Sequence, residues 1–168
     1  KSDWWYKTQT IQTTYSSDGL GTKYENSEKY YYDNPAHKQL TKTERLESGK
    51  KLREVETRYP LDATNVAPNE MWNELNTNYK HVHNRPIFVN ETIDGQLVKS
   101  IKSEYAYQND QIVLEKRSSI DRNGHYQQEF AIELVNPKGQ PRQIVGRDGV
   151  STVLLWGYNY SKIVAEIK

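Results

Sequence analysis

Residues 147–168, RDGVSTVLLWGYNYSKIVAEIK, carry the most apolar segment of a strongly polar chain and decide the fold prediction. The apolar run VLLW, at 153–156, lies between two turn dipeptides, Asp148-Gly149 and Asn159-Tyr160. Short apolar runs separated by such turn residues are typical of antiparallel hairpins. The segment therefore predicts the closing strands of a β-array, and the same rhythm recurs along the chain.

Turn signals separate extended runs throughout the sequence. They are Ser48-Gly49, Asp94-Gly95, Asn109-Asp110, Asn123-Gly124, Lys138-Gly139, Asp148-Gly149 and Asn159-Tyr160. Asn-Gly and Asp-Gly favour two-residue hairpin turns, because both central residues of such a turn need positive φ. From Asp94 onward the turns are spaced by fifteen, fourteen, fifteen, ten and eleven residues. This spacing predicts an antiparallel meander of long and then shorter strands.

Apolar residues alternate with polar ones between these turns. In each of two runs this alternation places the apolar residues on one face of the strand. The residues are Leu97, Ile101, Tyr105 and Tyr107 in the first run, and Ile112, Leu114 and Ile120 in the second. A period of two predicts strands with one buried and one solvated face. Residues 4–15, 22–33, 39–47 and 50–60 predict further strands, rich in Tyr, Thr and charge.

One segment departs from the strand pattern. Apolar residues stand at helical spacing at Met71, Trp72, Leu75, Tyr79 and Val82. Pro68 suits a first helical turn and Pro86 stops a helix, so a helix over 68–82 is expected to cover one face of the sheet. The predicted organisation is a single domain over 1–168, with N-terminal hairpins over 1–62 and a C-terminal meander over 86–168.

Composition narrows the class of protein. Hydrophobic residues make up 35% of the 168, and thirteen tyrosines supply much of the surface that can be buried, which predicts a thin core. The 23 basic and 22 acidic residues are interspersed, which argues against a nucleic-acid partner. No apolar run approaches the ~20 residues of a membrane-spanning helix. There is no cysteine, so disulfides and thiol chemistry are excluded.

Hairpin after hairpin, with tyrosines and a glycine at the turns, resembles the RHS or YD-repeat family, in particular secreted proteins of that type from Bacteroidetes. The likeness is strongest over 136–168, at Gly139, Asp148, Gly149, Trp156, Gly157, Tyr158, Asn159, Ala165, Glu166 and Ile167. Residues 84–107 resemble a preceding segment, and Tyr32-Asp33 a degenerate YD signature. Val135-Asn136 stands where the family usually shows Tyr-Asp. The resemblance implies a β-rich scaffold without an active site, in a secreted or cell-envelope protein.

Aromatic residues at the N-terminus support a rival interpretation. Rings are concentrated in the first thirty-two residues, and the candidate ligand-stacking residues are Trp4, Trp5, Tyr6, Tyr30 and Tyr32. Flat rings beside polar groups can stack on sugar rings, as in carbohydrate-binding modules. The same rings can instead form the core of a chain that is short of Leu and Val. Both interpretations stay open at this point.

Other chemistry-bearing residues have structural explanations. Asp94, Asp121 and Asp148 lie near turns, and no Asp-x-Asp-x-Asp calcium loop surrounds them. His81 and His83 have no adjacent third ligand for zinc. Glu54 and Glu56 share a strand face, as expected for a solvated, charged sheet surface. Neither a metal, a cofactor nor catalysis is predicted.

The sequence thus predicts a mostly all-β fold, an antiparallel meander of consecutive hairpins that forms a large twisted, curled sheet or a partly open barrel, with one short helix packed on it. The predicted function is that of a non-catalytic scaffold module of a secreted or cell-surface protein. The expected partners are neighbouring repeats of a parent chain or another protein, with a glycan as the alternative ligand. Excised sheet edges of this kind also favour a homodimer.

Overall fold

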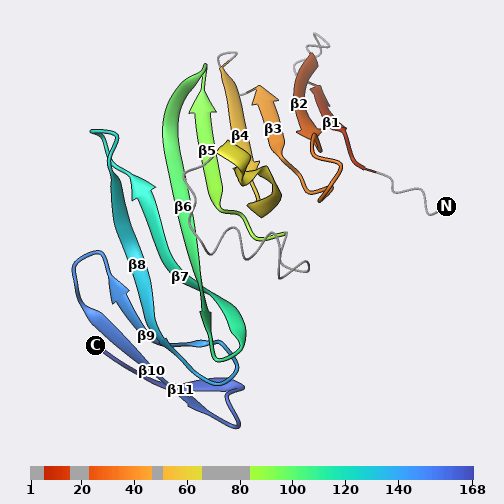
Figure 1. Cartoon of the computed structure of the whole chain (residues 1–168). Coiled ribbons are helices and arrows are strands. Elements are labelled where there is room, and N and C mark those ends of the chain that lie inside the picture. The colour runs from red at the N-terminus through yellow and green to blue at the C-terminus, as the bar shows by residue number, and fades with distance from the viewer. Residues whose placement is uncertain (1–5, 16–22, 47–50, 66–83) are drawn as a thin grey trace, which may run out of the picture.

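The computed structural model describes residues 6–15, 23–46, 51–65 and 84–168. Within them eleven strands form one antiparallel sheet in which each strand lies beside its neighbours in sequence (Figure 1). The strands are β1 (Gln9–Tyr15), β2 (Lys23–Tyr31), β3 (Lys42–Leu46), β4 (Leu52–Arg58), β5 (Phe88–Ile93), β6 (Gln96–Gln108), β7 (Gln111–Ile120), β8 (Tyr126–Val135), β9 (Pro141–Gly146), β10 (Ser151–Gly157) and β11 (Lys162–Ile167). The predicted all-β meander is confirmed.

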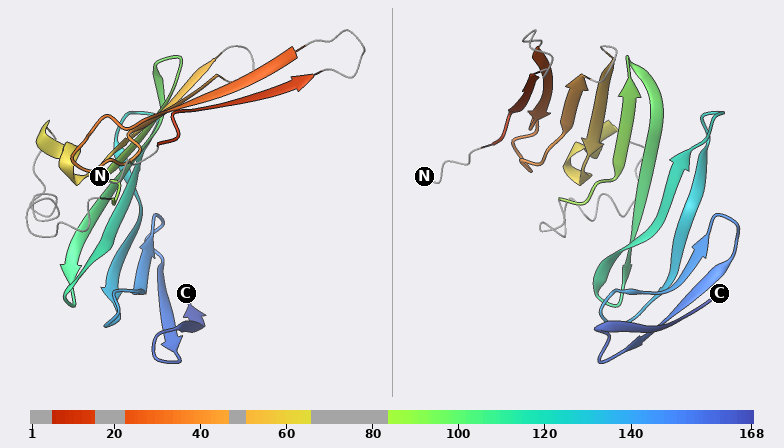
Figure 2. Two further views of the ribbon diagram at one scale, coloured as in Figure 1. Left: turned by 90° about the vertical axis from the view of Figure 1, so that its right-hand side faces the viewer. Right: turned by 180° about the vertical axis from the view of Figure 1, so that it is seen from behind.

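The sheet is a single twisted and curled layer that does not close. Strands β1 and β11 lie at its two ends and do not pair with each other. In Figure 2 the β1–β2 hairpin runs across the direction of β7 and β8 and projects away from the rest of the sheet. A right-handed twist accumulated over many strands produces this shape.

The helical element that the structure describes is a 3-10 helix, η1 (Pro60–Asn65), which follows β4. It lies on one face of the sheet beside β4 and β5 (Figures 1 and 2). The α-helix predicted over 68–82 lies outside the described residues. In the described part of the chain no helix is long and apolar enough to cross a membrane.

The described turns lie where the dipeptides place them, but they are of more than one kind. Asp94 and Gly95 both have positive φ, as do Asn109 and Asp110, which fits two-residue hairpin turns. Ser48-Gly49 lies outside the described residues. The expectation of a two-residue turn at each Asn-Gly and Asp-Gly was wrong, because Asn123 and Asp148 are not in the left-handed region.

Three of the remaining turns are built in the same way, over 121–125, 136–140 and 146–150. In each, the amide of the first residue donates to the carbonyl oxygen of the fifth at 2.8 to 2.9 Å. In each, a glycine at the fourth position has positive φ and donates its amide to the carbonyl oxygen of the first, at 2.9 to 3.1 Å. The same short turn therefore recurs at intervals of fifteen and then ten residues.

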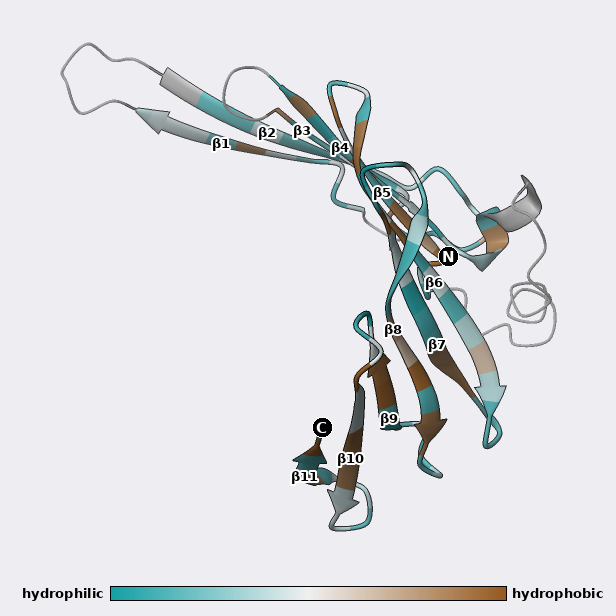
Figure 3. Cartoon of the chain, turned by 90° about the vertical axis from the view of Figure 1, so that its left-hand side faces the viewer, coloured by the Kyte–Doolittle hydropathy of each residue, from teal (hydrophilic) through white to brown (hydrophobic). Residues whose placement is uncertain are grey.

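Most of the buried apolar residues lie on one face of the sheet, whereas Val113 is buried on the other. The ladder partners place six buried residues on this face, which we call the covered face because η1 lies on it: Ile87, Ile101, Tyr105, Ile112, Ile132 and Leu154. Figure 3 shows apolar segments concentrated in β7 to β10, whereas β1 to β3 are mostly polar. The thin core expected from composition is thus carried mainly by the C-terminal strands.

Bulges break the simple alternation predicted for two strands. The register shifts between Glu104 and Tyr105, so β7 has one extra residue there. A one-residue insertion turns every later side chain to the other face of the sheet. Ile120 and Ile112 therefore lie on different faces. A second shift, in the ladder between β5 and β6, separates Leu97 from Ile101 in the same way. Both shared faces predicted from the sequence were wrong at these residues.

The segment before β5 packs on the covered face. Ile87 is fully buried, and its amide donates to the carbonyl oxygen of Arg58 at 2.8 Å. The hydroxyl of Tyr105 donates to the carbonyl oxygen of Pro86 at 2.9 Å. The guanidinium of Arg85 lies 5.6 Å from the centre of the Tyr105 ring. These contacts hold the segment against β6 and the end of β4.

Candidate functional site

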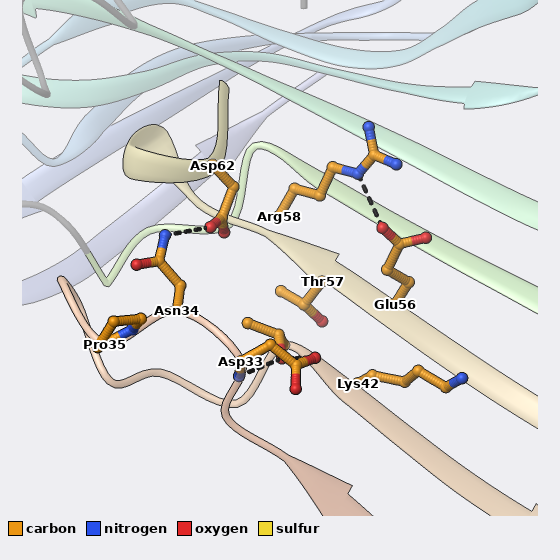
Figure 4. Close-up of a pocket in the computed structure, with 9 residues that line it drawn as sticks. Asp33, Asn34, Pro35, Lys42, Glu56, Thr57, Arg58 and Asp62 are labelled. Atoms are coloured by element: carbon orange, nitrogen blue, oxygen red, sulfur yellow. Dashed lines mark hydrogen bonds and ion pairs between the residues drawn. The ribbon is translucent and has the colours of Figure 1, made fainter. Parts of the chain in front are cut away.

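A pocket of about 450 Å³ lies where the β2–β3 loop meets the end of β4 and η1 (Figure 4). It is lined by Asp33, Asn34, Pro35, Thr41, Lys42, Glu56, Thr57, Arg58 and Asp62. Nearly all of these side chains are polar or charged. The chemistry of the pocket is set by how those charges are paired.

Asp62 is the hub of the hydrogen bonds on the η1 side of this pocket. Its carboxylate accepts from the amide nitrogen of Asn34 at 2.6 Å and from the backbone N–H of Tyr59 at 2.9 Å. His37 Nε2 lies 2.9 and 3.0 Å from its two oxygens. Burial raises the pKa of this carboxyl, but the three donors outweigh burial and the net pKa is lowered. Asp62 is therefore an ionised acceptor that fastens η1 to the β2–β3 loop.

His37 is the third donor in this hydrogen-bond network, and its ring is neutral. Its Nδ1 accepts the backbone N–H of Gln39 at 2.9 Å, so Nδ1 carries a lone pair and Nε2 carries the proton that it donates to Asp62. The side chain has no exposed surface, and its ring lies 5.0 Å from that of Tyr59. A buried histidine with both nitrogens satisfied packs the loop and has no free nitrogen for catalysis or metal binding.

A ladder of charges runs across β2, β3 and β4 on the face opposite the covered face. Lys42 Nζ lies 2.7 Å from a carboxylate oxygen of Glu44 and 2.7 Å from one of Glu54. The hydroxyl of Tyr31 donates to Glu44 at 2.6 Å. The hydrogen bonds to Glu44 and then Glu54 raise the pKa of Lys42. The hydrogen bond from Lys42, then that from Tyr31, lowers the pKa of Glu44.

The remaining charges of the pocket are also paired. Arg58 Nε donates to Glu56 at 2.9 Å, and Thr41 donates its hydroxyl to Asp33 at 3.1 Å (Figure 4). Glu54 and Glu56 share a face, as the sequence predicts, each with its own cation. The pocket is thus an open, polar hollow in which each ionised side chain already has a hydrogen-bond or ion-pair partner. Such a surface suits water or a hydroxyl-rich molecule.

The structure brings together two of the five aromatic residues predicted to stack on a ligand. The rings of Tyr6 and Tyr32 have centroids 4.6 Å apart at an interplanar angle of 36°. Tyr30 lies apart from them, with Lys7 Nζ 5.2 Å from its ring and its hydroxyl donating to Glu28 at 2.8 Å. Trp4 and Trp5 lie outside the described residues.

A second hollow, of about 410 Å³, lies beside Tyr6 and is lined also by His37, Lys38 and Gln39. Tyr6 is 37% exposed, so its ring is available to this hollow while it packs on Tyr32. One aromatic ring next to polar groups is the minimum that a sugar-stacking site needs. The rival interpretation of the N-terminal aromatics therefore has a defined location.

The pairing of His37 with Asp62 could not be found from the sequence. The two residues are twenty-five positions apart, and each lies in a short polar stretch that resembles an ordinary loop. The local signals were weak: Asn34-Pro35 indicates a turn, and Pro60 suits the start of a helix. Neither signal says that the β2–β3 loop folds against the residues that follow β4.

The acidic turn residues act on the backbone. Asp121 Oδ1 accepts the amides of Asn123 and His125 at 2.8 and 2.9 Å, which lowers the pKa of Asp121. The carboxylate of Asp94 accepts the amide of Leu52 at 2.8 Å. Asp148 accepts the amide of Val150 at 3.1 Å. Among the described residues no three carboxylates or histidines gather at metal-binding distance, and His81 and His83 lie outside them.

Comparisons with known proteins add no relative. No family model, no curated protein and no solved structure matches this chain.

Proposed function

We propose that this chain is a non-catalytic β-scaffold module of the RHS or YD-repeat type, in which successive hairpins extend one sheet and present its surface to neighbouring repeats or to another protein. The observation that carries the proposal is the turn repeated over 121–125, 136–140 and 146–150. A unit that recurs with the same hydrogen bonds, on strands that each pair with their sequence neighbours, is the pattern of a repeat array.

In two of these turns the side chain at the first position accepts the same backbone hydrogen bonds, which supports the comparison with the repeat family. Asp121 Oδ1 accepts the amides two and four residues further on. Asn136 Oδ1 accepts the amides at the same two positions, at 2.9 and 3.1 Å. Asn136 stands where the family usually has the Asp of Tyr-Asp, so the departure noted in the sequence leaves the turn intact. The amide oxygen replaces the carboxylate oxygen as acceptor.

The connectivity of the sheet also favours a scaffold. All of the extensive contacts between elements join sequence neighbours, so stability passes along the sheet from strand to strand. A protein built in this way tolerates added units, because each new hairpin pairs with the edge strand of the preceding hairpin and packs only against that neighbour.

Duplication of one unit tests this proposal. A second copy of residues 121–145 inserted after Val145 adds two strands and restores the chain direction before β10. We expect a soluble protein with proportionally more strand signal in circular dichroism and an unfolding midpoint at or above that of the parent. A matched insertion of twenty-five Gly and Ser residues at the same site is the control and should add no strand. An unfolded duplication product would contradict the repeat proposal.

Sugar binding is a second candidate function, because Tyr6 and Tyr32 pack together beside the 410 Å³ hollow. A glycan array screened with the folded chain tests it, with tryptophan fluorescence to confirm any hit. The scaffold proposal expects a blank array. The control is Tyr15→Ala, which removes another tyrosine ring, at the far end of β1. A ligand that no longer binds Tyr6→Ala but still binds Tyr15→Ala would establish the sugar-binding function instead.

We also propose a secreted or cell-surface location, which the resemblance to secreted RHS or YD-repeat proteins supports. Protease treatment of intact source cells, followed by detection with an antibody to this chain, tests the location. Loss of the signal without lysis is the expected result. A signal that disappears only after lysis would contradict a surface location.

A further inference from the structure

The two outer strands of the sheet differ in how their free edges are protected. Every strand from β2 to β10 pairs on both sides, whereas β1 and β11 pair on one side within the described residues. An unpaired strand edge presents backbone N–H and C=O groups that can bind another strand. Proteins usually block such edges with charges, prolines or bulges.

β11 carries these protective features. Its register with β10 is interrupted by a bulge between Leu155 and Trp156. Lys162 and Glu166 lie within its six residues, and Lys168 follows directly. A bulged, charged and short edge is a poor template for a second strand.

β1 has none of these features. Its seven residues, QTIQTTY, contain no charge, no proline and no glycine, and their register with β2 is continuous. Ile11 is 59% exposed and Tyr15 is 68% exposed. The β1–β2 hairpin also projects from the rest of the sheet, so a second molecule can approach its outer edge (Figure 2). A β-prone, uncharged and accessible edge is suited to strand addition.

The hydrogen-bond phase of β1 identifies the groups that face outward. The amide of Tyr30 donates to the carbonyl oxygen of Thr8 at 2.9 Å, and the antiparallel pattern repeats every second residue. Thr10, Gln12 and Thr14 therefore direct their backbone groups toward β2. The outward amides and carbonyls belong to the alternate residues Gln9, Ile11, Thr13 and Tyr15.

We propose that β1 pairs with β1 of a second copy of this chain, antiparallel and centred on Gln12, so that one sheet continues through both molecules. This register sets Gln12 opposite Gln12 of the second copy, and it sets Ile11 opposite Thr13 and Gln9 opposite Tyr15. Each pair falls on one face of the joined sheet, as an antiparallel ladder requires.

A second copy fits this edge because β1 is complementary to itself. β1 contains no charged residue, so the Gln12-centred register brings no like charges together. It also sets Thr10 opposite Thr14, a pair whose hydroxyls can hydrogen-bond. The pairing is isologous and closes as a two-fold dimer, while protected β11 edges prevent growth into a filament. A contact of one strand is smaller than a standard stable interface, so the Kd is expected on the order of micromolar to millimolar.

Sedimentation of the full chain over a wide concentration range tests the proposal, and it is independent of the scaffold proposal, which the duplication experiment addresses. The wild type is expected to shift from monomer toward dimer as concentration rises. Thr13→Pro removes an outward amide without touching the bonds to β2, so it should abolish the dimer and leave circular dichroism unchanged. A wild type that stays monomeric throughout would overturn the proposal.

Charge placed at the two-fold position provides a rescue that loss of folding cannot imitate. Gln12→Lys sets two lysines opposite each other and should abolish the dimer, as should Gln12→Glu by itself. An equimolar mixture of the two variants should dimerise again, because each interface then joins opposite charges. Ile163→Lys on β11 is the matched control and should dimerise like the wild type. A dimer that survives in Gln12→Lys, or that is lost in Ile163→Lys, would place the contact elsewhere and refute the β1 interface.

Discussion

Strands β1 to β4 and strands β5 to β10 belong to one sheet, yet different side chains stabilise them. The C-terminal strands share a stripe of buried apolar residues on the covered face. The N-terminal strands have few such residues, and polar ladders such as Tyr31–Glu44–Lys42–Glu54 join them instead. Backbone pairing is therefore common to the whole sheet, whereas the side-chain contribution changes from polar ladders in the N-terminal strands to apolar burial in the C-terminal strands.

The two sources differ in magnitude. Full burial of a large aliphatic side chain contributes about 1.5–3 kcal/mol, whereas a partly exposed ion pair contributes about 0–1 kcal/mol. We therefore expect the N-terminal strands to open at a lower free energy than the C-terminal strands, except where Asp62 and His37 fasten the β2–β3 loop. Four substitutions test this difference between the two parts of the sheet.

The largest effect is expected from Ile87→Ala, which empties a fully buried position on the covered face. The lost packing and the cavity should lower the free energy of unfolding by about 2–5 kcal/mol. Urea unfolding followed by circular dichroism measures the loss. Ile163→Ala, on the exposed part of β11, is the control and should change stability by less than about 0.5 kcal/mol. Equal losses in the two variants would show that the apolar stripe is not the main source of stability.

Asp62→Asn removes the charge that accepts three donors and should cost about 1–3 kcal/mol at neutral pH, because buried donors are left poorly paired. Asp110→Asn, an exposed change, is the control and should be nearly neutral. If Asp62→Asn leaves the free energy of unfolding unchanged, the β2–β3 loop is held by packing alone.

The same carboxylate predicts a pH dependence. The pKa of Asp62 is lowered in the folded state from its ordinary value of 3.8, so its stabilising effect is complete above that value and is lost as pH falls through the folded-state pKa. The difference in stability between wild type and Asp62→Asn should thus be largest near neutral pH and shrink below about pH 4. Urea midpoints across this range measure it, and a constant difference would contradict the assignment.

An intermediate effect is expected at the repeated turns of the C-terminal strands. Gly139→Ala should cost about 1–2 kcal/mol for positive φ alone, and more because a Cβ there would overlap the Gln111 side chain. Gly124→Ala has the same backbone penalty but open space around the Cβ, so it should cost less. Thermal unfolding of both variants measures the difference. The reverse order would show that the Gln111 side chain moves aside without cost.

The smallest effect is expected from Lys42→Met in the polar ladder. Removal of the cation leaves Glu44 directly opposite Glu54, and two like charges in a cross-strand pair repel. The expected loss is about 0.5–1 kcal/mol, and it should diminish at high salt because the carboxylates are partly exposed. Unfolding in low and high salt measures both. A loss above that of Ile87→Ala would reverse the comparison between the two parts of the sheet.

The candidate site was predictable only in part. Tyr6 and Tyr32 could be selected from composition as candidate ligand-stacking rings, since aromatic residues are dense at the N-terminus. Their contact with each other, and the hollow beside Tyr6, depend on how the first strand and the β2–β3 loop meet in space. The Asp62–His37 hub was missed because a hydrogen bond between residues far apart in sequence leaves no local pattern.

The strands, the positions of the turns and their order could be read from local sequence, because hairpins depend on local dihedral preferences and on a period of two. Asp94-Gly95 and the glycines at 124, 139 and 149 act within a few residues of chain. The face that a side chain occupies beyond a bulge, as at Ile120, and the open shape of the sheet became known from the three-dimensional structure. Both depend on register and twist summed over many strands, and no short stretch of sequence contains that sum.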